Sequence, residues 1–166
     1  MARTSAGLLM FRRRGAGGPE VLLAHPGGPF WRRKDAGAWS IPKGEIDPDE
    51  DQLRAAIREF TEETGAAPAG DFLPLGELRQ AGGKRVVAFA VEGDFDPRAI
   101  RSNTFDVEWP PRSGRMQSFP EIDRAEWFGI EEARGRILKS QIPFLDRLQV
   151  LLGEAAARRA GRPVRP

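Results

Sequence analysis

The chain has 166 residues, with 26 basic and 24 acidic side chains and a formal net charge of +2. This length is enough for one domain with its own hydrophobic core and requires no second domain. The chain has no cysteine and a single histidine, His25, so its composition excludes disulfides, thiolate metal sites and histidine-based zinc sites. Any bound metal is therefore expected to have oxygen ligands.

The positive charge is concentrated at one end of the chain. Four arginines fall within residues 158–166, which leaves the remainder at about −2. We expect residues 1–157 to form the folded domain and residues 158–166 to form a basic, flexible tail. The basic pI is then weak evidence for nucleic-acid binding. No apolar stretch reaches transmembrane length, and the run at residues 6–11 is too short for a signal peptide, so we expect a cytoplasmic protein without a membrane partner.

Two short strands are predicted at residues 4–11 and 20–24, separated by a glycine-rich turn. The arginines at residues 12–14 flank this turn and are expected to form a solvated rim. His25 opens the next loop, and a lone histidine without an evident partner favours a structural role over a catalytic one. The chain has no tyrosine, so stacking on a nucleobase would require Trp or Phe, and the candidates are Phe30, Trp31 and Trp109. Each of these residues, considered alone, is more simply interpreted as an ordinary packing residue.

The stretch at residues 39–44 reads Trp-Ser-Ile-Pro-Lys-Gly. Lys43 would present a positive charge beside the acidic segment that follows, where a polyphosphate would need neutralising. A second interpretation is structural, with Trp39 in the core and Gly44 shaping a turn. The two interpretations are compatible.

An amphipathic helix is predicted within residues 44–65. Its apolar residues recur at helical spacing, namely Leu53, Ala56, Ile57 and Phe60. We expect Asp47 to be the N-cap, with Pro48 as the first helical residue and Glu50 completing a capping box. Gly65 suits a left-handed C-cap.

Three carboxylates crowd one face of this predicted helix. Glu59 and Glu63 lie on one strip at helical spacing, with Glu62 beside them. Like charges at this spacing repel, and a divalent cation would offset the repulsion. Mg²⁺ and Mn²⁺ take carboxylate oxygens and retain positions for water and substrate phosphates. The pattern therefore predicts part of a metal site that substrate completes.

Further strands are predicted at residues 72–79, 85–91 and 105–109, with a polar loop at residues 112–118. A short helix is predicted at residues 130–138, and an amphipathic helix from Ile142 to about Arg159 that packs on the sheet. Mixed strands and helices of this kind predict a single α/β sandwich domain.

The acidic helix closely resembles the Nudix box. Its conserved pattern matches Gly44, Glu50, Arg58, Glu59, Phe60, Glu62, Glu63 and Gly65 at the required spacing. Only Ala66 departs from the pattern, where a larger aliphatic residue is usual. The resemblance implies the Nudix fold, a mixed β-sheet sandwiched between α-helices, and a Nudix pyrophosphohydrolase activity with a divalent cation as cofactor.

The resemblance also implies roles for individual residues. The expected metal ligands are Glu59, Glu62, Glu63, Glu121 and the backbone of Gly44. Glu121 enters because many Nudix enzymes carry a further glutamate shortly before a Trp-containing strand, here Trp127. Glu121 or a glutamate of the box would accept the proton of the attacking water. Arg58 is expected to orient the catalytic site by pairing with Glu50, and Glu50 and Gly65 are expected to be structural.

The substrate is expected to be a small molecule. The stretch at residues 39–44 resembles the lead-in of Nudix enzymes that act on dinucleoside polyphosphates, diphosphoinositol polyphosphates or capped RNA ends, and it marks Trp39 and Lys43 as substrate-binding candidates. We expect a dinucleoside polyphosphate, while oxidised nucleoside triphosphates, ADP-ribose, diphosphoinositol phosphates and RNA 5′ ends stay open. The alternative outside the enzymes is a non-catalytic module that binds a nucleotide. The complete set of glutamates disfavours it, because a module that only binds need not retain every metal ligand.

Overall fold

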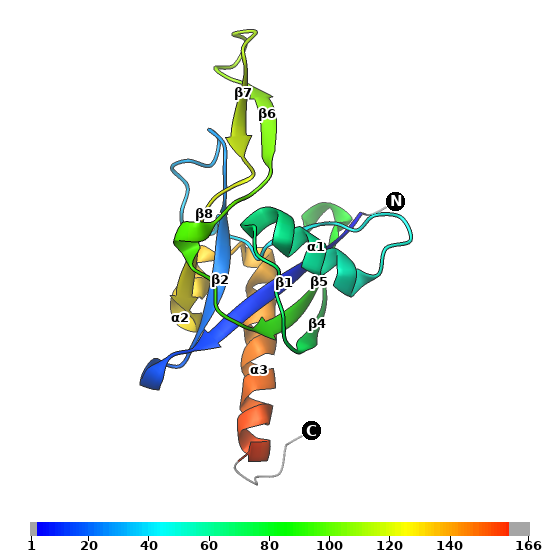
Figure 1. The fold of residues 1–166 in the computed structure, drawn as a ribbon, viewed down its shortest axis with the longest axis vertical. Coiled ribbons are helices and arrows are strands. Elements are labelled where there is room, and N and C mark those ends of the chain that lie inside the picture. The colour runs from blue at the N-terminus through cyan, green and yellow to red at the C-terminus, as the bar shows by residue number, and fades with distance from the viewer. Residues whose placement is uncertain (1–2, 160–166) are drawn as a thin grey trace.

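A computed structural model of the chain describes residues 3–159. It contains a six-stranded mixed sheet in the order β4-β5-β1-β2-β8, with β3 paired to β1 (Figure 1). The strands of this sheet are β1 (Thr4–Arg13), β2 (Pro19–Pro26), β3 (Lys43–Glu45), β4 (Phe72–Arg79), β5 (Arg85–Glu92) and β8 (Ile122–Gly129). The helices are α1 (Gln52–Thr64), α2 (Ile130–Arg136) and α3 (Ile142–Arg159).

Strand β1 is the centre of the sheet. It runs parallel to β5 and antiparallel to β2 and β3. Because successive side chains point to opposite faces, β1 contributes to two separate cores. Leu8 and Met10 join the core beneath α1, whereas Leu9 and Phe11 join the core beneath α2 and α3. Both faces of this strand are therefore covered, which explains its nearly continuous apolar sequence.

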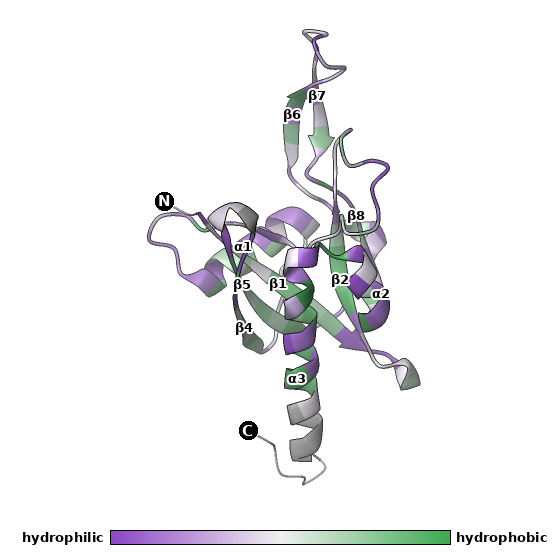
Figure 2. Cartoon of the chain, turned by 180° about the vertical axis from the view of Figure 1, so that it is seen from behind, coloured by the Kyte–Doolittle hydropathy of each residue, from purple (hydrophilic) through white to green (hydrophobic). Residues whose placement is uncertain are grey.

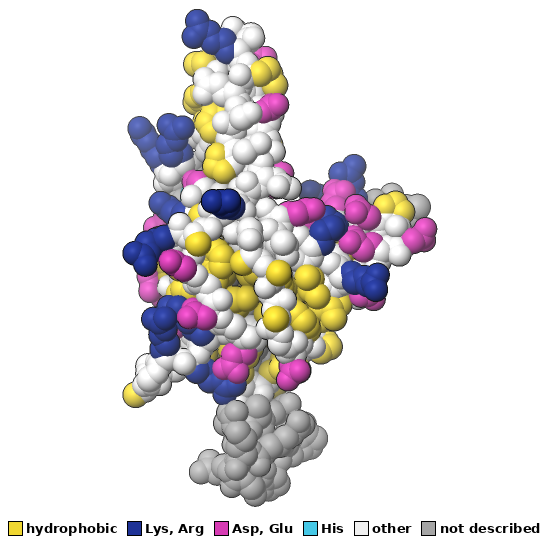
Figure 3. All heavy atoms as spheres, viewed as in Figure 1, with side chains coloured by type: hydrophobic (Ala, Val, Ile, Leu, Met, Phe, Trp, Pro, Cys, Tyr) yellow, Lys and Arg dark blue, Asp and Glu magenta, His cyan; other side chains and the backbone are white. Residues whose placement is uncertain are grey.

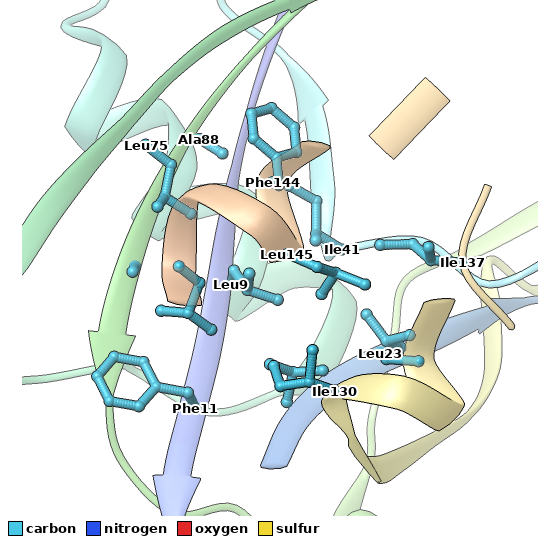
Figure 4. Packing of buried hydrophobic residues seen from close by; sticks show 14 of the residues in the cluster. Leu9, Phe11, Leu23, Ile41, Leu75, Ala88, Ile130, Ile137, Phe144 and Leu145 are labelled. Carbon is cyan, nitrogen blue, oxygen red and sulfur yellow. The ribbon is translucent and has the colours of Figure 1, made fainter. Parts of the chain in front are cut away.

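The helices lie on both sides of the sheet, as Figure 1 shows. Helix α1 buries Phe60 on one face, and α3 buries Phe144 and Leu145 on the other, close to Leu9 and to Ile130 of α2 (Figure 4). Figure 2 shows the matching hydropathy, with apolar residues concentrated in the strands and alternating with polar ones along α3. The predicted α/β sandwich with a mixed sheet is confirmed.

A two-stranded hairpin projects from the sandwich (Figure 1). It is formed by β6 (Thr104–Glu108) and β7 (Met116–Pro120). The prediction of a loop over residues 112–118 was therefore wrong at its C-terminal end, where β7 begins. Strand β7 is mostly exposed and packs no face against a core, so it lacks the apolar alternation from which strands are predicted.

The beginning of helix α1 corrects a prediction. The N-cap is Asp51, not Asp47, and its side chain accepts a hydrogen bond from the backbone N–H of Arg54. Asp49 has a φ of 64°, which interrupts a right-handed helix at that point. The expected contact between Glu50 and the backbone N–H of Asp47 does form, at 3.0 Å, but it closes a turn ahead of the helix.

The end of α1 is as predicted, because Gly65 adopts the left-handed conformation with φ 84° and donates its N–H to the carbonyl of Thr61. Helix α3 extends to Arg159, so the first two residues of the predicted tail are helical, and residues 160–166 lie outside the described residues. Within residues 3–159, none of the helices combines the length and the apolarity that crossing a bilayer requires.

Candidate active site

A hollow of about 240 Å³ opens beside the N-terminal end of β3. Its wall includes three of the predicted site residues, Lys43, Glu63 and Glu121, together with Trp31 from the long loop between β2 and β3. The remaining lining residues are Ala24, Pro26, Ala38, Ser40, Ile41, Ile122 and Leu138. The fold thus gathers side chains from α1, from the β2–β3 loop and from the junction of β7 and β8.

Glu63 is the most deeply buried carboxylate in this hollow. Its Oε2 accepts a hydrogen bond of 3.0 Å from the backbone N–H of Lys43. Burial raises the pKa of Glu63 to about 8; the Lys43 N–H and charge oppose this shift, and the charges of Glu59 and Glu121 add to it. At neutral pH this carboxyl group therefore favours its protonated form unless a cation lies nearby.

Glu59 lies against the backbone of β3. A Cβ atom on Gly44 would collide with the Glu59 carboxylate, so only glycine permits this approach. Burial raises the pKa of Glu59, the charge of Arg58 lowers it, and the charges of Glu62 and Glu121 raise it further. The charge of Glu121 thus raises the pKa of both Glu59 and Glu63, although Glu121 comes from a distant part of the chain.

Arg58 holds several of these carboxylates through one guanidinium group. Its Nε and Nη2 donate to the two oxygens of Glu50 at 2.8 and 2.9 Å, so Arg58 and Glu50 form the pair expected from the sequence. Its Nη1 donates to Glu59 at 2.9 Å and to Glu62 at 3.2 Å. The hydrogen bonds from Arg58, together with that from the Asp47 N–H, lower the pKa of Glu50 to about 2. Glu50 therefore stays charged and orients Arg58.

Glu121 is positioned by two backbone hydrogen bonds to segments distant in the sequence. Its N–H donates to the carbonyl of Asn103, and its carbonyl accepts from Gly27 at the end of β2, both at 2.8 Å. The N–H of Asn103 in turn donates to the carbonyl of Glu62 at 3.1 Å. The base of the β6–β7 hairpin is therefore tied to the C-terminal turn of α1 and to β2.

Trp39 lies in the core and not in the lining of the hollow. Its side chain is 1% exposed, packs edge-on against Phe128 and donates from Nε1 to Asp35 at 2.8 Å. The structural interpretation of Trp39 therefore fits its position better than direct contact with substrate. Trp31 is the aromatic residue that lines the hollow, and its signal in the sequence is a large aromatic side chain within a glycine- and proline-rich loop.

His25 is fully buried and structural in its contacts. Its Nδ1 lies 2.9 Å from Oδ1 of Asp123, and its Nε2 lies 2.6 Å from the carbonyl oxygen of Lys34. Both partners offer acceptor oxygens to the ring nitrogens. The histidine thus connects β2 to β8 and to the middle of the loop that carries Trp31.

The donor set fits a hard cation. Within residues 3–159 no three carboxylate or imidazole side chains converge into a group that could hold a metal by themselves. The buried Glu59 and Glu63, however, offer carboxylate oxygens close to the backbone of β3, and their raised pKa values indicate a need for positive charge. A cation at this position would complete its coordination with water, backbone carbonyls and substrate oxygens.

A mixed sheet between helices, with an acidic helix bordering the pocket, places this chain among single-domain α/β sandwich proteins whose carboxylates suit a hard cation. A family model described as NUDIX domain matches residues 1–148, and the chain belongs to the Nudix family.

Two curated relatives match parts of the chain. An RNA pyrophosphohydrolase of Rhizobium meliloti (strain 1021) is 36% identical over 117 residues, covering 60% of this chain and 64% of that protein. An RNA pyrophosphohydrolase of Erythrobacter litoralis (strain HTCC2594) is 56% identical over 34 residues, covering 20% of this chain and 21% of that protein. The chain thus spans less than two thirds of each of these relatives.

Solved structures resemble the fold over most of the chain. A binary complex of the Ap4A hydrolase of C. elegans aligns with a TM-score of 0.62 at 23% identity, covering 90% of this chain and 98% of that one. The NUDIX domain of Shewanella oneidensis NrtR in complex with ADP ribose aligns with a TM-score of 0.64 at 17% identity, covering 92% and 89%. At these identities the likeness establishes the fold alone.

Proposed function

We propose that this protein is a metal-dependent pyrophosphohydrolase that cleaves a phosphoanhydride bond in a nucleoside diphosphate linked to another moiety. The observation that carries the proposal is the position of Glu63, a buried carboxylate beside Lys43 in a hollow that also contains Glu121. A charge buried in this way is costly without a cationic partner. A divalent cation, Mg²⁺ or Mn²⁺, supplies that partner and attracts a polyphosphate to the same place.

Glu59 and Glu63 would be the principal ligands of the cation, with Glu62, Glu121 and the backbone of Gly44 as further oxygen donors. When bound, the cation would neutralise phosphate oxygens and acidify a nearby water. Lys43 would hold the phosphate chain at the mouth of the hollow. Glu121 or a glutamate of the helix would accept the proton of the attacking water. Arg58 would act as a positioning residue, because its guanidinium orients Glu59 and Glu62.

A dinucleoside polyphosphate is the substrate we propose first. The lead-in at residues 39–44 supports it through Lys43, which lines the hollow, and Trp31 offers an aromatic surface within the same wall. An RNA 5′ end is the second candidate, because the curated relatives that match this chain are RNA pyrophosphohydrolases. A cytoplasmic location stays a prediction from the sequence.

The test is product identification for the purified protein with diadenosine tetraphosphate, ADP-ribose, a nucleoside triphosphate and a 5′-triphosphorylated RNA oligonucleotide. Each substrate is assayed with Mg²⁺, with Mn²⁺ and with chelator. We expect cation-dependent cleavage of diadenosine tetraphosphate to exceed that of the others. A clear preference for the RNA would replace the proposed substrate. No cleavage of any compound, together with stabilisation by nucleotide, would favour a binding module instead.

A further inference from the structure

A second hollow lies next to the candidate active site, between the β2–β3 loop and the projecting hairpin. Its volume is about 390 Å³. It is lined by Pro29, Phe30, Arg32, Arg33, Lys34 and Trp109. None of these residues belongs to the acidic helix or to the predicted metal site. The lining combines two aromatic rings with three cationic side chains, a composition that ordinary solvated loops do not require.

Trp31 and its neighbours in the loop line the two hollows in turn. Trp31 lines the active-site hollow, whereas its neighbours Phe30 and Arg32 line the second one. The ammonium group of Lys34, which lines the second hollow, lies 4.9 Å from the centre of the Trp31 ring. Consecutive residues of one loop therefore line the two hollows. A ligand that extends out of the active site past Trp31 would reach the second hollow.

The aromatic residues are held by the surrounding structure. Phe30 and Trp109 meet edge to face, with ring centres 5.5 Å apart, although they come from the β2–β3 loop and from the end of β6. The backbone N–H of Trp109 donates to the backbone carbonyl of Arg115 across the hairpin at 2.9 Å. A Cβ atom on Gly28 would approach Phe105 of the hairpin within 2.7 Å, so loop and hairpin are in close contact. The aromatic pair is thus presented by two packed segments.

The charge around this hollow is positive. Figure 3 shows Lys and Arg side chains gathered beside the projecting hairpin, on the side where the β2–β3 loop lies in Figure 1. The three cations of the lining are consecutive, and among the described residues no carboxylate forms an ion pair with Arg32, Arg33 or Lys34. Aromatic faces bind nucleobases by stacking, and cations bind phosphates.

We propose that this hollow binds the second nucleoside of a dinucleoside polyphosphate, with its base against Phe30 and Trp109 and its adjoining phosphate near Arg32, Arg33 and Lys34. This inference rests on the proposed function, because it extends the same substrate beyond the scissile anhydride. A space of about 390 Å³ is in the range of pockets for one small ligand and suits a single nucleoside better than a polynucleotide.

The position of the hairpin gives this site a role in substrate choice. The residue that follows β7 is Glu121, whose N–H bonds to Asn103 at the start of the hairpin. A nucleoside held by Trp109 would therefore be bound by the same element that positions Glu121 in the active site. A substrate without the second nucleoside would lack this contact and would bind through its phosphates alone.

The test compares diadenosine tetraphosphate with adenosine 5′-tetraphosphate, which has the same phosphate chain and lacks the second nucleoside. Dissociation constants are measured by calorimetry with Mg²⁺ in the Glu63→Gln background, where binding can be followed without turnover. Phe30→Ala and Trp109→Ala should each weaken binding of diadenosine tetraphosphate by about 5- to 100-fold. Binding of adenosine 5′-tetraphosphate should change by less than about twofold. Met116→Ala, at a 65% exposed position of the same hairpin, is the matched control.

Trp109→Phe keeps an aromatic face and should restore most of the affinity, which separates lost stacking from a disturbed hairpin. An equal loss for both ligands, or no loss for either, would overturn the proposal. So would a loss confined to a 5′-triphosphorylated RNA oligonucleotide, since the hollow would then bind a polynucleotide. These outcomes do not depend on hydrolysis: a wild-type protein that cleaves no phosphoanhydride would refute the proposed function, while the affinity difference would still report on this site.

Discussion

The backbone N–H of Lys43 donates a 3.0 Å hydrogen bond to the buried carboxylate of Glu63, joining β3 to the last turn of α1. One N–H is too little to compensate a buried charge, because the pKa of Glu63 stays raised to about 8. The hydrogen bond thus holds the carboxylate in place but does not compensate its negative charge. This combination fits the proposed site for a cation and a polyphosphate.

Replacing Glu63 by Gln should abolish activity without unfolding the protein. The amide retains the shape and can still accept from Lys43, but it cannot supply a charged oxygen to a cation. We expect turnover of diadenosine tetraphosphate to fall by about two to four orders of magnitude at saturating Mg²⁺. Glu77→Gln, on the edge strand β4, serves as the control and should keep full activity. Retained turnover in Glu63→Gln would refute the assigned role.

The stability of the metal-free protein should decrease as the pH rises. The folded pKa of Glu63 is about 8, above its ordinary value of 4.5, so the folded state binds this proton more tightly than the unfolded state. The stabilisation is complete below pH 4.5 and is lost as the pH rises through 8. Urea unfolding in chelator should show a slope of up to about 1.4 kcal/mol per pH unit in this window.

The same titration provides its own control. Glu63→Gln should remove most of this slope, because the amide has no proton to lose, and Mg²⁺ at pH 8 should stabilise the variant less than the wild type. Glu50 titrates near pH 2 and lies outside the window. Parallel pH profiles for wild type and variant would contradict the picture of a buried, ionisable Glu63.

Arg58→Lys should weaken the response to divalent cation. A lysine cannot donate to both oxygens of Glu50 and also hold Glu59, as the guanidinium does. Residues that orient metal ligands typically contribute about 10- to 100-fold to metal affinity or activity. We therefore expect the Mg²⁺ concentration for half-maximal activity to rise by this factor. Arg54→Lys, on the exposed face of the same helix, should leave it unchanged.

Gly44→Ala should reduce activity by displacing Glu59. The added methyl group would overlap the Glu59 carboxylate, and a shift of about 1 Å at a reacting centre can cost about 100-fold in rate. The measurement is turnover, with circular dichroism to verify the fold. Gly135→Ala in α2 adds the same methyl group into open space and should be silent. Equal turnover in Gly44→Ala and wild type would show that Glu59 does not need its present position.

His25→Phe should destabilise the protein through two lost hydrogen bonds. It removes the donor to the Lys34 carbonyl and to the partly exposed Asp123 carboxylate, and a lost hydrogen bond typically costs about 0.5–1.5 kcal/mol. Urea denaturation at neutral pH measures this loss. His25→Gln retains a donor and should lose less. If the two variants were equally stable, packing of the ring against Trp39 would be its main contribution.

The local sequence determined the parts of the site that lie on one helix. The spacing of Glu59, Glu62 and Glu63 follows from the geometry of the α-helix, and Arg58 lies one turn before Glu62 wherever the helix is placed. Gly65 ends the helix as predicted because only the local backbone conformation is involved. The strands at the centre of the sheet were also predictable, since burial on both faces gives them continuous apolar sequences.

The tertiary structure decided what lies opposite that helix. Sheet pairing places Lys43 beside Glu63, and the return of the chain through the β6–β7 hairpin places Glu121 there too. It also buried Trp39 and left Trp31 in the wall of the hollow. The sequence does not indicate which of these two tryptophans in one loop is buried. Contacts between residues far apart in sequence depend on how packed elements meet, and no local periodicity records them. The geometry of the helix was therefore predictable from the sequence, whereas the pocket beside it was not.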